Sequence, residues 1–330
     1  MSKEIEEELI ARRAKRDASF FDLYSIDQLS NDDINLIYDI APVFKKHKTA
    51  KLSLNKGCSM VHTFFESSTR TLASFDLSAK NLSMDTTNVS SGNTDKKGES
   101  FLDTAETIDA YNPKVVSIRT AQSGVAEFLS RHIKASVINA GDGWHEHPTQ
   151  ALLDGMTMLS HFGGNSLKGK TVTIIGDILH SRVFGSLVRL LKKLEATVRV
   201  SGPQTMLPAY VENFGVSVHY NVEEALEGAD VIYTLRVQGE RGANTFVPTL
   251  REYSKMYGIS RKRLDIANKN AILMHPGPVQ RDIDVHSALV SVDPQSHILK
   301  QVENGMAVRK SVLWLLCQRY DGLEKEFARL

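Results

Sequence analysis

Hydroxyl side chains and one arginine gather where a predicted strand gives way to a predicted helix. The strand is expected over Ser59–Phe65, and the segment Ser68–Thr71, which includes Arg70, follows at the start of the helix. A helix N-terminus presents unpaired backbone N–H groups, so with a guanidinium beside it this segment suits a phosphate. Neither GxxxxGKS/T nor GxGxxG occurs between the strand and this helix, so the segment is not one of those phosphate loops. An ordinary Ser/Thr cap with a surface arginine is the alternative.

A second polar corner follows the predicted strand Ser136–Asn139. A glycine-rich turn leads to His147 and Gln150, and Pro148 stands where a helix would begin. Strand-to-helix corners are common places for ligand contacts in α/β sheets. A metal pair formed by His145 and His147 is disfavoured, because no third ligand with suitable spacing is present. A capping or core histidine is the other interpretation.

Arginines follow three of the predicted strands. Arg119 comes after Lys114–Ile118, and Arg236 follows Val231–Leu235. Arg182 stands where a helix begins, after the strand Thr171–Ile175 and its Gly176-Asp177 turn. Gln238 lies two residues beyond Arg236 and on the same side of an extended chain. Each arginine alone could be a solvated surface residue. Together at strand ends, they favour a substrate set with several negative charges.

A polar loop, Ser90–Glu99, precedes a helical pattern and is punctuated by glycine. It contains Lys96 and Lys97, and polar loops of this kind are often mobile. The loop could therefore close on an anion or could remain a solvated surface loop.

The segment His275-Pro276-Gly277-Pro278 follows the predicted strand Ala271–Met274. Prolines have no backbone N–H, so a turn that holds two of them offers carbonyl oxygens. Such acceptors suit the amide or amine group of a ligand.

The elements that must position these side chains alternate between short apolar strands and helical patterns. One helical face holds Leu72, Phe75 and Ala79, and another holds Leu187, Leu190 and Leu194. Alternation of this kind predicts an α/β protein with parallel sheets flanked by helices. The 330 residues suffice for about two domains. The break at Gly163-Gly164 places their boundary near residues 150–165.

Composition narrows the class of protein. Lys+Arg is 40 against Asp+Glu 39, and this balance argues against a nucleic-acid partner. No run of about 18 apolar residues occurs, so no membrane span is expected. Two cysteines make neither a disulfide framework nor a zinc site, and the charged N-terminus is not a secretory signal. The sequence predicts a soluble, cytoplasmic protein.

Taken in order, these segments resemble the aspartate/ornithine carbamoyltransferase family. The resemblance rests on four motifs that span most of the chain: Ser68-Thr69-Arg70-Thr71, His147-Pro148-Thr149-Gln150, Arg236-Val237-Gln238 and His275-Pro276-Gly277-Pro278. Two features are similar to the aspartate branch. Arg236-Val237-Gln238 is followed by Glu240-Arg241, and His-Pro-Gly-Pro stands where the ornithine branch has His-Cys-Leu-Pro.

The resemblance implies transfer of a carbamoyl group from carbamoyl phosphate to the amine of L-aspartate, in pyrimidine synthesis. It implies two domains joined by bridging helices: residues 1–150 for carbamoyl phosphate and 151–303 for aspartate, with a helix from about 304–330 packing back on the first. It implies no cofactor and no metal. A homotrimer with shared active sites is expected, and whether a regulatory chain or a dihydroorotase binds stays open.

The resemblance also assigns roles residue by residue. Ser68, Thr69, Arg70 and Thr71 would hold the phosphate, and Arg119 would bridge the phosphate and the carbonyl. His147 would donate to the carbonyl oxygen. Gln150 and the carbonyls of Pro276 and Gly277 would hold the carbamoyl NH2, with Pro278 fixing the turn. Arg182, Arg236 and Gln238 would bind the aspartate carboxylates, and Lys97 would reach both substrates. We expect Arg70, Thr71, Lys97, Arg119 and His147 to be catalytic.

Two positions depart from the family pattern. Leu72 stands where an arginine is frequent, and Asn93 stands where a serine usually precedes the loop lysine, with Thr94 next to it. A carbamoyltransferase for another amine acceptor and an inactive scaffold are the competing interpretations. Arg182 and Arg236 argue against a cationic acceptor. The presence of Arg70, Arg119, His147 and Lys97 argues against an inactive scaffold.

Overall fold

The chain divides into two compact units in the computed structural model, which describes residues 2–14, 18–48, 50–90, 100–237 and 249–318. Residues 1–153 and 303–330 form the first unit, and residues 154–302 form the second. The chain passes from one unit to the other within two helices, α6 (Pro148–Phe162) and α12 (Ile298–Gln318).

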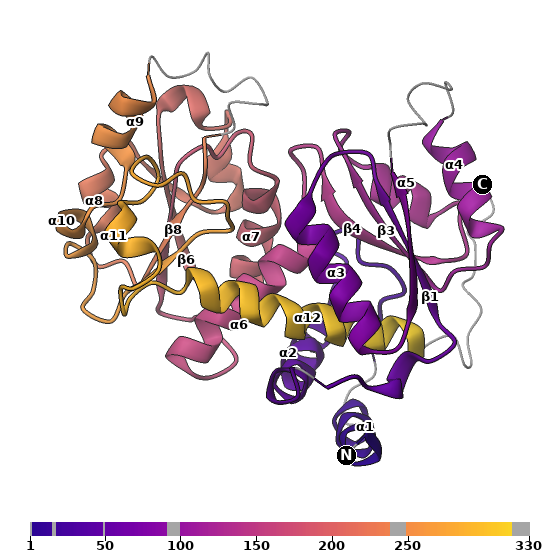
Figure 1. Cartoon of the computed structure of the whole chain (residues 1–330). Coiled ribbons are helices and arrows are strands. Elements are labelled where there is room, and N and C mark those ends of the chain that lie inside the picture. The colour runs from indigo at the N-terminus through magenta and orange to yellow at the C-terminus, as the bar shows by residue number, and fades with distance from the viewer. Residues whose placement is uncertain (1, 15–17, 49, 91–99, 238–248, 319–330) are drawn as a thin grey trace. The chain divides into compact units, whose positions relative to one another are not determined.

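The first unit is built on a parallel sheet of four strands in the order β2-β1-β3-β4 (Figure 1). The strands are β1 (Ser59–Phe64), β2 (Asp85–Ser90), β3 (Val115–Thr120) and β4 (Ser136–Asp142). β1 is central, and its Phe64 pairs with Arg119 of β3. Because the sheet is parallel, the carboxyl ends of all four strands lie at one edge.

Helices cover both faces of this sheet, as a parallel sheet requires. The helices of this unit are α1 (Ser2–Arg13), α2 (Asn31–Lys46), α3 (Thr69–Asn81), α4 (Phe101–Asp109) and α5 (Val125–Ser130), with a short 3-10 turn at Ser53–Asn55. α4 and α5 pack through Ile108 and Leu129 onto buried strand residues such as Val116. The C-terminal part of α12 lies beside α3, where Arg309 Nη1 donates to Ser74 Oγ at 2.8 Å.

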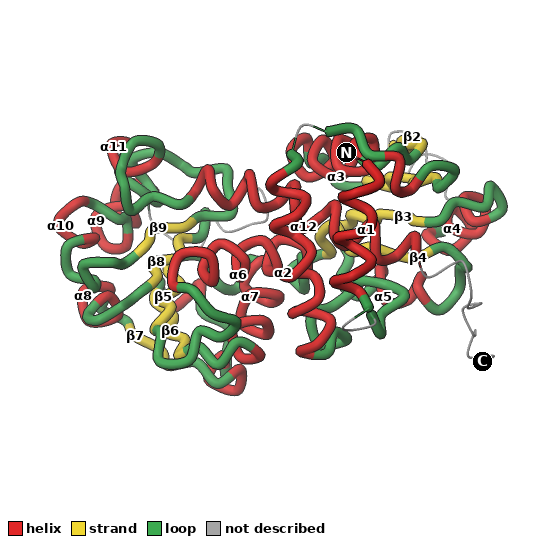
Figure 2. Tube along the Cα trace, turned by 90° about the horizontal axis from the view of Figure 1, so that it is seen from below, coloured by secondary structure: helices red, strands yellow, loops and turns green. Residues whose placement is uncertain are grey.

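The second unit holds a parallel sheet of five strands in the order β7-β6-β5-β8-β9. The strands are β5 (Thr171–Ile175), β6 (Thr197–Ser201), β7 (Ser217–His219), β8 (Val231–Thr234) and β9 (Ile272–Met274). The helices are α7 (Arg182–Lys193), α8 (Val222–Leu226), α9 (Leu250–Tyr257), α10 (Arg261–Leu264) and α11 (Ser287–Val290), with 3-10 turns at Gln204–Met206 and Val211–Phe214. Figure 2 shows α8, α9 and α10 on one side of this sheet and α6 and α7 on the other.

The predicted α/β class is confirmed. The strand predictions differ from the structure at β2 and at the ends of β3 and β4, since β4 runs to Asp142 where the prediction ended at Asn139. β2 has the sequence Asp-Thr-Thr-Asn-Val-Ser, which lacks an apolar period, so no strand is expected there. It forms because it pairs with β1 as the outermost strand of the sheet. β3 extends to Thr120, so Arg119 lies within the strand and does not follow it. Within the described residues, the helices are too short or too polar to cross a bilayer.

Candidate active site

The N-terminus of α3 lies at the carboxyl edge of the first sheet. Ser68 is its N-cap, with φ −156° and ψ 88°, and the Ser68 side chain makes no capping hydrogen bond. Thr69 and Arg70 are exposed, and Thr71 is half-buried. Since the first N–H groups of a helix have no partner within it, this turn is able to receive an anion. The helix start predicted from the Ser-Thr-Arg-Thr segment is therefore present.

Arg119 lies between the ends of β1 and β4. Its Nη1 donates to the Ala140 carbonyl at 3.1 Å, and its Nε lies 3.4 Å from Glu66 Oε2. The Phe65 N–H donates to the Arg119 carbonyl at 2.8 Å, which ties the end of β1 to β3. The side chain is only 14% exposed, so its contacts hold the guanidinium at the carboxyl edge of the sheet.

His147 and Gln150 lie at the start of α6, which begins at Pro148. Both side chains are largely buried, His147 at 5% and Gln150 at 9% exposure. The Gln150 N–H donates to the His147 carbonyl at 2.9 Å, so one helical turn places the two residues together. The predicted strand-to-helix corner is therefore present at the end of β4. It lies at the same sheet edge as Arg119 and the start of α3.

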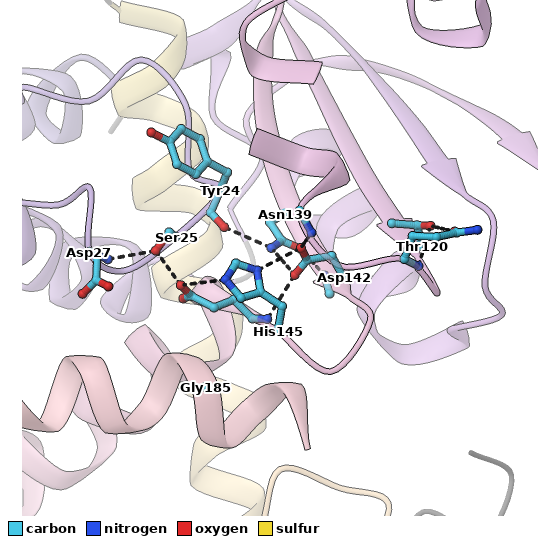
Figure 3. A network of polar contacts seen from close by, with 12 residues as sticks. Tyr24, Ser25, Asp27, Thr120, Asn139, Asp142, His145 and Gly185 are labelled. Carbon is cyan, nitrogen blue, oxygen red and sulfur yellow. Dashed lines mark hydrogen bonds and ion pairs between the residues drawn. The ribbon is translucent and has the colours of Figure 1, made fainter. Parts of the chain in front are cut away.

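The turn before His147 is organised by the buried carboxylate of Asp142 (Figure 3). Asp142 Oδ2 accepts the Gly124 N–H at 2.7 Å and lies 3.1 Å from His145 Nδ1. Asp142 Oδ1 accepts Asn139 Nδ2–H at 2.8 Å and the Glu146 N–H at 3.0 Å. One carboxylate thus fixes four groups around the turn.

Glu146 extends this network to the N-terminal segment. Its carboxylate accepts the Ser25 hydroxyl at 2.5 Å and the Ile26 N–H at 3.0 Å, and its side chain is fully buried. The Asn139 amide also donates to the Tyr24 carbonyl at 3.0 Å (Figure 3). His147 is therefore preceded by a turn that is anchored both within the sheet and to residues 24–26.

Electrostatics agree with an ionised Asp142. Burial raises the pKa of this carboxyl, but hydrogen bonds from His145, Asn139 and Gly124 outweigh burial and hold the pKa below its ordinary value. Sequence reasoning missed Asp142, Asn139 and Glu146. In the sequence, Asn139 ends the predicted strand and Asp142 stands between two glycines just after it. This pattern also fits an ordinary turn.

Two arginines lie at the carboxyl edge of the second sheet. Arg182 is the first residue of α7 and is 4% exposed, and the Ser181 hydroxyl caps that helix by accepting the Phe184 N–H at 3.4 Å. Arg236 follows β8, the neighbour of β5 in the sheet, and is half-buried. Between β5 and α7, Asp177 Oδ1 and His180 Nδ1 are 2.7 Å apart in a buried pair that fixes the turn before Arg182.

The His275–Pro278 turn lies at the end of β9, at the same edge. The Gly277 N–H donates to His275 Nδ1 at 2.7 Å. Within the described residues, the carbonyl oxygens of Pro276 and Gly277 accept no hydrogen bond. The turn therefore uses its one internal N–H on itself and leaves two backbone acceptors available.

Two of the predicted site residues, Lys97 and Gln238, lie outside the described residues, as do Asn93, Thr94 and the Glu240-Arg241 pair. His145, considered above as one of a metal pair, is instead hydrogen-bonded to Asp142. The described part of the chain contains no group of three His, Cys, Asp or Glu side chains arranged to hold a metal ion.

Two parallel α/β units, each with cationic side chains at the carboxyl edge of its sheet, define a two-domain α/β protein. Residues 22–160 match the family model for the aspartate/ornithine carbamoyltransferase carbamoyl-P binding domain. Residues 168–316 match the model for the Asp/Orn binding domain of that family. The chain belongs to the aspartate/ornithine carbamoyltransferase family.

Relatives within the family carry the name of its aspartate branch. An aspartate carbamoyltransferase catalytic subunit of Desulforamulus reducens is 47% identical over 299 residues, which cover 89% of this chain and 95% of that protein. The corresponding subunit of Syntrophotalea carbinolica is 45% identical over 298 residues, which cover 89% of this chain and 94% of that protein.

Solved structures agree with this family. Aspartate transcarbamoylase of Trypanosoma cruzi, in complex with carbamoyl phosphate and aspartate, is similar with a TM-score of 0.78 and 29% identity, covering 89% of this chain and 95% of that chain. Ornithine carbamoyltransferase of Thermus thermophilus has the same fold, with a TM-score of 0.79 and 22% identity, covering 90% of this chain and 99% of that chain.

Proposed function

We propose that this chain transfers the carbamoyl group of carbamoyl phosphate to the amine of L-aspartate, giving N-carbamoyl-L-aspartate and phosphate for pyrimidine biosynthesis. Relatives at 45–47% identity carry that activity in their names. The observation that carries the choice of acceptor is the pair Arg182 and Arg236, which follow neighbouring strands of the domain that matches the Asp/Orn model. Two guanidiniums suit the carboxylates of aspartate and repel the cationic side chain of ornithine.

In the reaction, one bond forms and one bond breaks at the carbamoyl carbon. The neutral amine of aspartate attacks that carbon, a C–N bond forms, and negative charge develops on the carbonyl oxygen. The C–O bond to phosphate then breaks, and the leaving phosphate takes the proton of the amine. No covalent intermediate with the protein is needed, so catalysis consists of positioning and charge stabilisation.

We assign the phosphate to the start of α3, where Ser68, Thr69, Arg70 and Thr71 supply hydroxyl, backbone N–H and guanidinium donors. The exposure of Thr69 and Arg70 and the uncapped Ser68 hydroxyl support this assignment. Arg119 would contact both the phosphate and the carbonyl oxygen. Its guanidinium is already oriented by Ala140 and Glu66, so little reorganisation would accompany the reaction.

We assign the carbamoyl group to His147, Gln150 and the His275–Pro278 turn. His147 would act as a neutral hydrogen-bond donor to the carbonyl oxygen, where charge develops. Gln150 and the carbonyls of Pro276 and Gly277 would accept hydrogen bonds from the NH2 group, and Pro278 would fix the turn. The unoccupied backbone acceptors of Pro276 and Gly277 support this assignment. Gln238 would add to the aspartate site, and Lys97 would contact both substrates.

The test is carbamoyl transfer by the purified chain, with aspartate and ornithine offered separately. We expect product with aspartate alone, and Arg182→Gln should raise the KM for aspartate more than tenfold while the KM for carbamoyl phosphate changes little. Arg189→Gln is the matched control, since Arg189 lies on the same helix and donates to the Gly185 carbonyl. Product with ornithine, or no product with either acceptor, would refute the proposal.

We further propose a homotrimer in which Lys97 completes the site of a neighbouring subunit. Mixed trimers of Lys97→Ala and Arg70→Ala chains, each inactive alone, should then regain part of the activity, because some sites would receive both intact residues. Light scattering of the purified chain measures the subunit number. Absence of recovery in a preparation shown to exchange subunits would exclude shared sites.

A further inference from the structure

A buried carboxylate lies beneath the His275–Pro278 turn and has no role in the mechanism above. Asp284 and His275 both have fully buried side chains, and Asp284 Oδ2 lies 3.1 Å from His275 Nε2. The same oxygen accepts the Gln280 N–H at 2.8 Å. A buried carboxylate is costly unless it is paired, so these contacts are what holds Asp284 in place.

The hydrogen bonds fix the tautomer of His275. Because Nδ1 accepts the Gly277 N–H at 2.7 Å, its lone pair points at that group and the ring proton lies on Nε2. The Nε2–H then donates to Asp284. Asp284 thereby sets the orientation of the ring, and the ring sets the direction of the Gly277 N–H.

The direction of that N–H decides where the Pro276 carbonyl points. The Pro276 carbonyl and the Gly277 N–H belong to one planar trans peptide unit, in which they point in opposite directions. With the N–H held against His275, the carbonyl oxygen of Pro276 is directed away from the buried pair. The acceptor assigned to the carbamoyl NH2 is thus oriented by His275 and Asp284.

The base of the turn is anchored independently of Asp284. The His275 N–H donates to Gln301 Oε1 at 2.9 Å, and Gln301 Nε2 donates to Asp154 Oδ1 at 2.7 Å. Asp154 Oδ2 also accepts the Tyr233 hydroxyl at 2.6 Å. Loss of Asp284 would therefore leave the end of β9 in place and would free the Gln280 N–H, the ring and the peptide that the ring orients.

We propose that Asp284 is a positioning residue for carbamoyl transfer. Acting through His275 Nε2–H, it aligns the backbone carbonyl of Pro276 with the carbamoyl NH2 group. This inference rests on the proposed function. The two ends of carbamoyl phosphate are assigned to different elements, the phosphate to the start of α3 and the NH2 group to this turn. Loss of Asp284 should therefore affect the NH2 contacts and not the phosphate contacts.

The test compares Asp284→Leu, which removes the acceptor at similar volume, with Asp284→Asn, whose single oxygen is able to accept from both His275 Nε2–H and the Gln280 N–H. For Asp284→Leu we expect kcat/KM for carbamoyl phosphate to fall by about tenfold to a hundredfold, as for a small misplacement of a reacting group. Inhibition by inorganic phosphate should change less than about twofold, because a missing hydrogen bond at the turn leaves the phosphate donors at the start of α3 intact. Asp284→Asn should recover most of the activity.

A matched control is Asp282→Asn, two residues away. Asp282 is exposed and accepts the Ser287 N–H and hydroxyl at 2.8 and 2.6 Å, without contact to His275. The Asp282→Asn substitution should leave all kinetic constants unchanged. If Asp284→Leu does not fold, as judged by far-UV circular dichroism, Asp284→Glu replaces it, since it keeps the charge but displaces the acceptor, and the same split is expected.

Three results would overturn the inference. The first is an Asp284→Leu enzyme with unchanged kcat/KM. The second is an Asp284→Leu enzyme whose inhibition by inorganic phosphate weakens as much as its kcat/KM falls. The third is an Asp284→Asn enzyme that is as impaired as the leucine variant. A wild-type chain that transfers no carbamoyl group would instead remove the proposed function itself, so the two failures are distinguishable.

Discussion

Replacing Asp142 by asparagine tests whether the turn before His147 is held by one charge. The carboxylate is 1% exposed and receives four donors, from Gly124, His145, Asn139 and Glu146. An asparagine has one acceptor oxygen, so its NH2 group must face one of the two pairs of donors. If it faces Gly124 and His145, the imidazole is able to present a lone pair, but the Gly124 N–H is left without an acceptor.

The cost follows from these contacts. One buried N–H without a partner costs about 1–3 kcal/mol, and the remaining bonds lose the assistance of the charge. We therefore expect Asp142→Asn to lower the free energy of unfolding by about 3 kcal/mol. We also expect kcat to fall by about a hundredfold, because His147 follows the turn and a shift of about 1 Å costs roughly that much.

Urea unfolding followed by circular dichroism measures the stability, and steady-state carbamoyl transfer measures the activity. The matched control is Asp109→Asn in the same unit. The Asp109 carboxylate accepts the backbone N–H groups of Lys134 and Ala135 before β4, at the opposite edge of the sheet. The control should lose about 1 kcal/mol and no activity. An Asp142→Asn chain as stable as wild type, or one that loses stability but keeps its kcat, would refute the reasoning.

Three further predictions concern other residues. Burial lowers the pKa of His62 to about 4 from 6.5. Between these two pKa values the unfolded chain binds a proton that the folded chain does not. The free energy of unfolding should therefore be highest above pH 6.5 and fall by about 2 kcal/mol between pH 7 and pH 5. His62→Gln should remove that slope in urea titrations, and an unchanged slope would assign it to other groups. Gly176→Ala should cost about 3 kcal/mol or more, because φ is +131° and a Cβ would lie 2.5 Å from the Leu235 carbonyl oxygen, whereas Gly164→Ala, with open space around it, should cost about 1 kcal/mol in the same thermal assay. Equal costs would contradict the steric argument. His147→Ala should lower kcat by about a hundredfold or more through loss of a donor to the developing oxyanion, and an intact rate would exclude that role.

The sequence by itself determines the fold class and most of the strand ends. The β-branched runs Thr171–Ile175 and Thr197–Ser201, each bounded by turn residues, predict two strands whose limits agree with those of β5 and β6. The helical faces of α3 and α7 follow the 3.6-residue period of their apolar side chains. Since all strands of a parallel sheet end at one edge, the polar residues after the strands could be placed together without coordinates.

Local patterns do not determine β2 or the position of Arg119. β2 has no apolar period, and it is a strand only because β1 offers it a partner. Arg119 stays within β3 because the Phe65 N–H beyond β1 continues the pairing to its carbonyl. In both cases the deciding hydrogen bonds come from another strand, which a local pattern of side chains does not reveal.

The tertiary structure alone decides which carboxylates hold the residues of the candidate site in place. Glu146 is paired with Ser25, which lies 121 positions earlier in the chain, and Asp154 is paired with Gln301, which lies 147 positions later. Asp142 and Asp284 are likewise polar residues in turns, where exposure to water is the ordinary expectation. They are buried because the folded chain surrounds them with donors, which lie up to 18 positions away for Asp142 and up to 9 positions away for Asp284. Side-chain hydrogen bonds of this kind leave no periodic signal in the sequence. The sequence thus determines which side chains reach the edge of each sheet, and only folding decides which buried charges orient them.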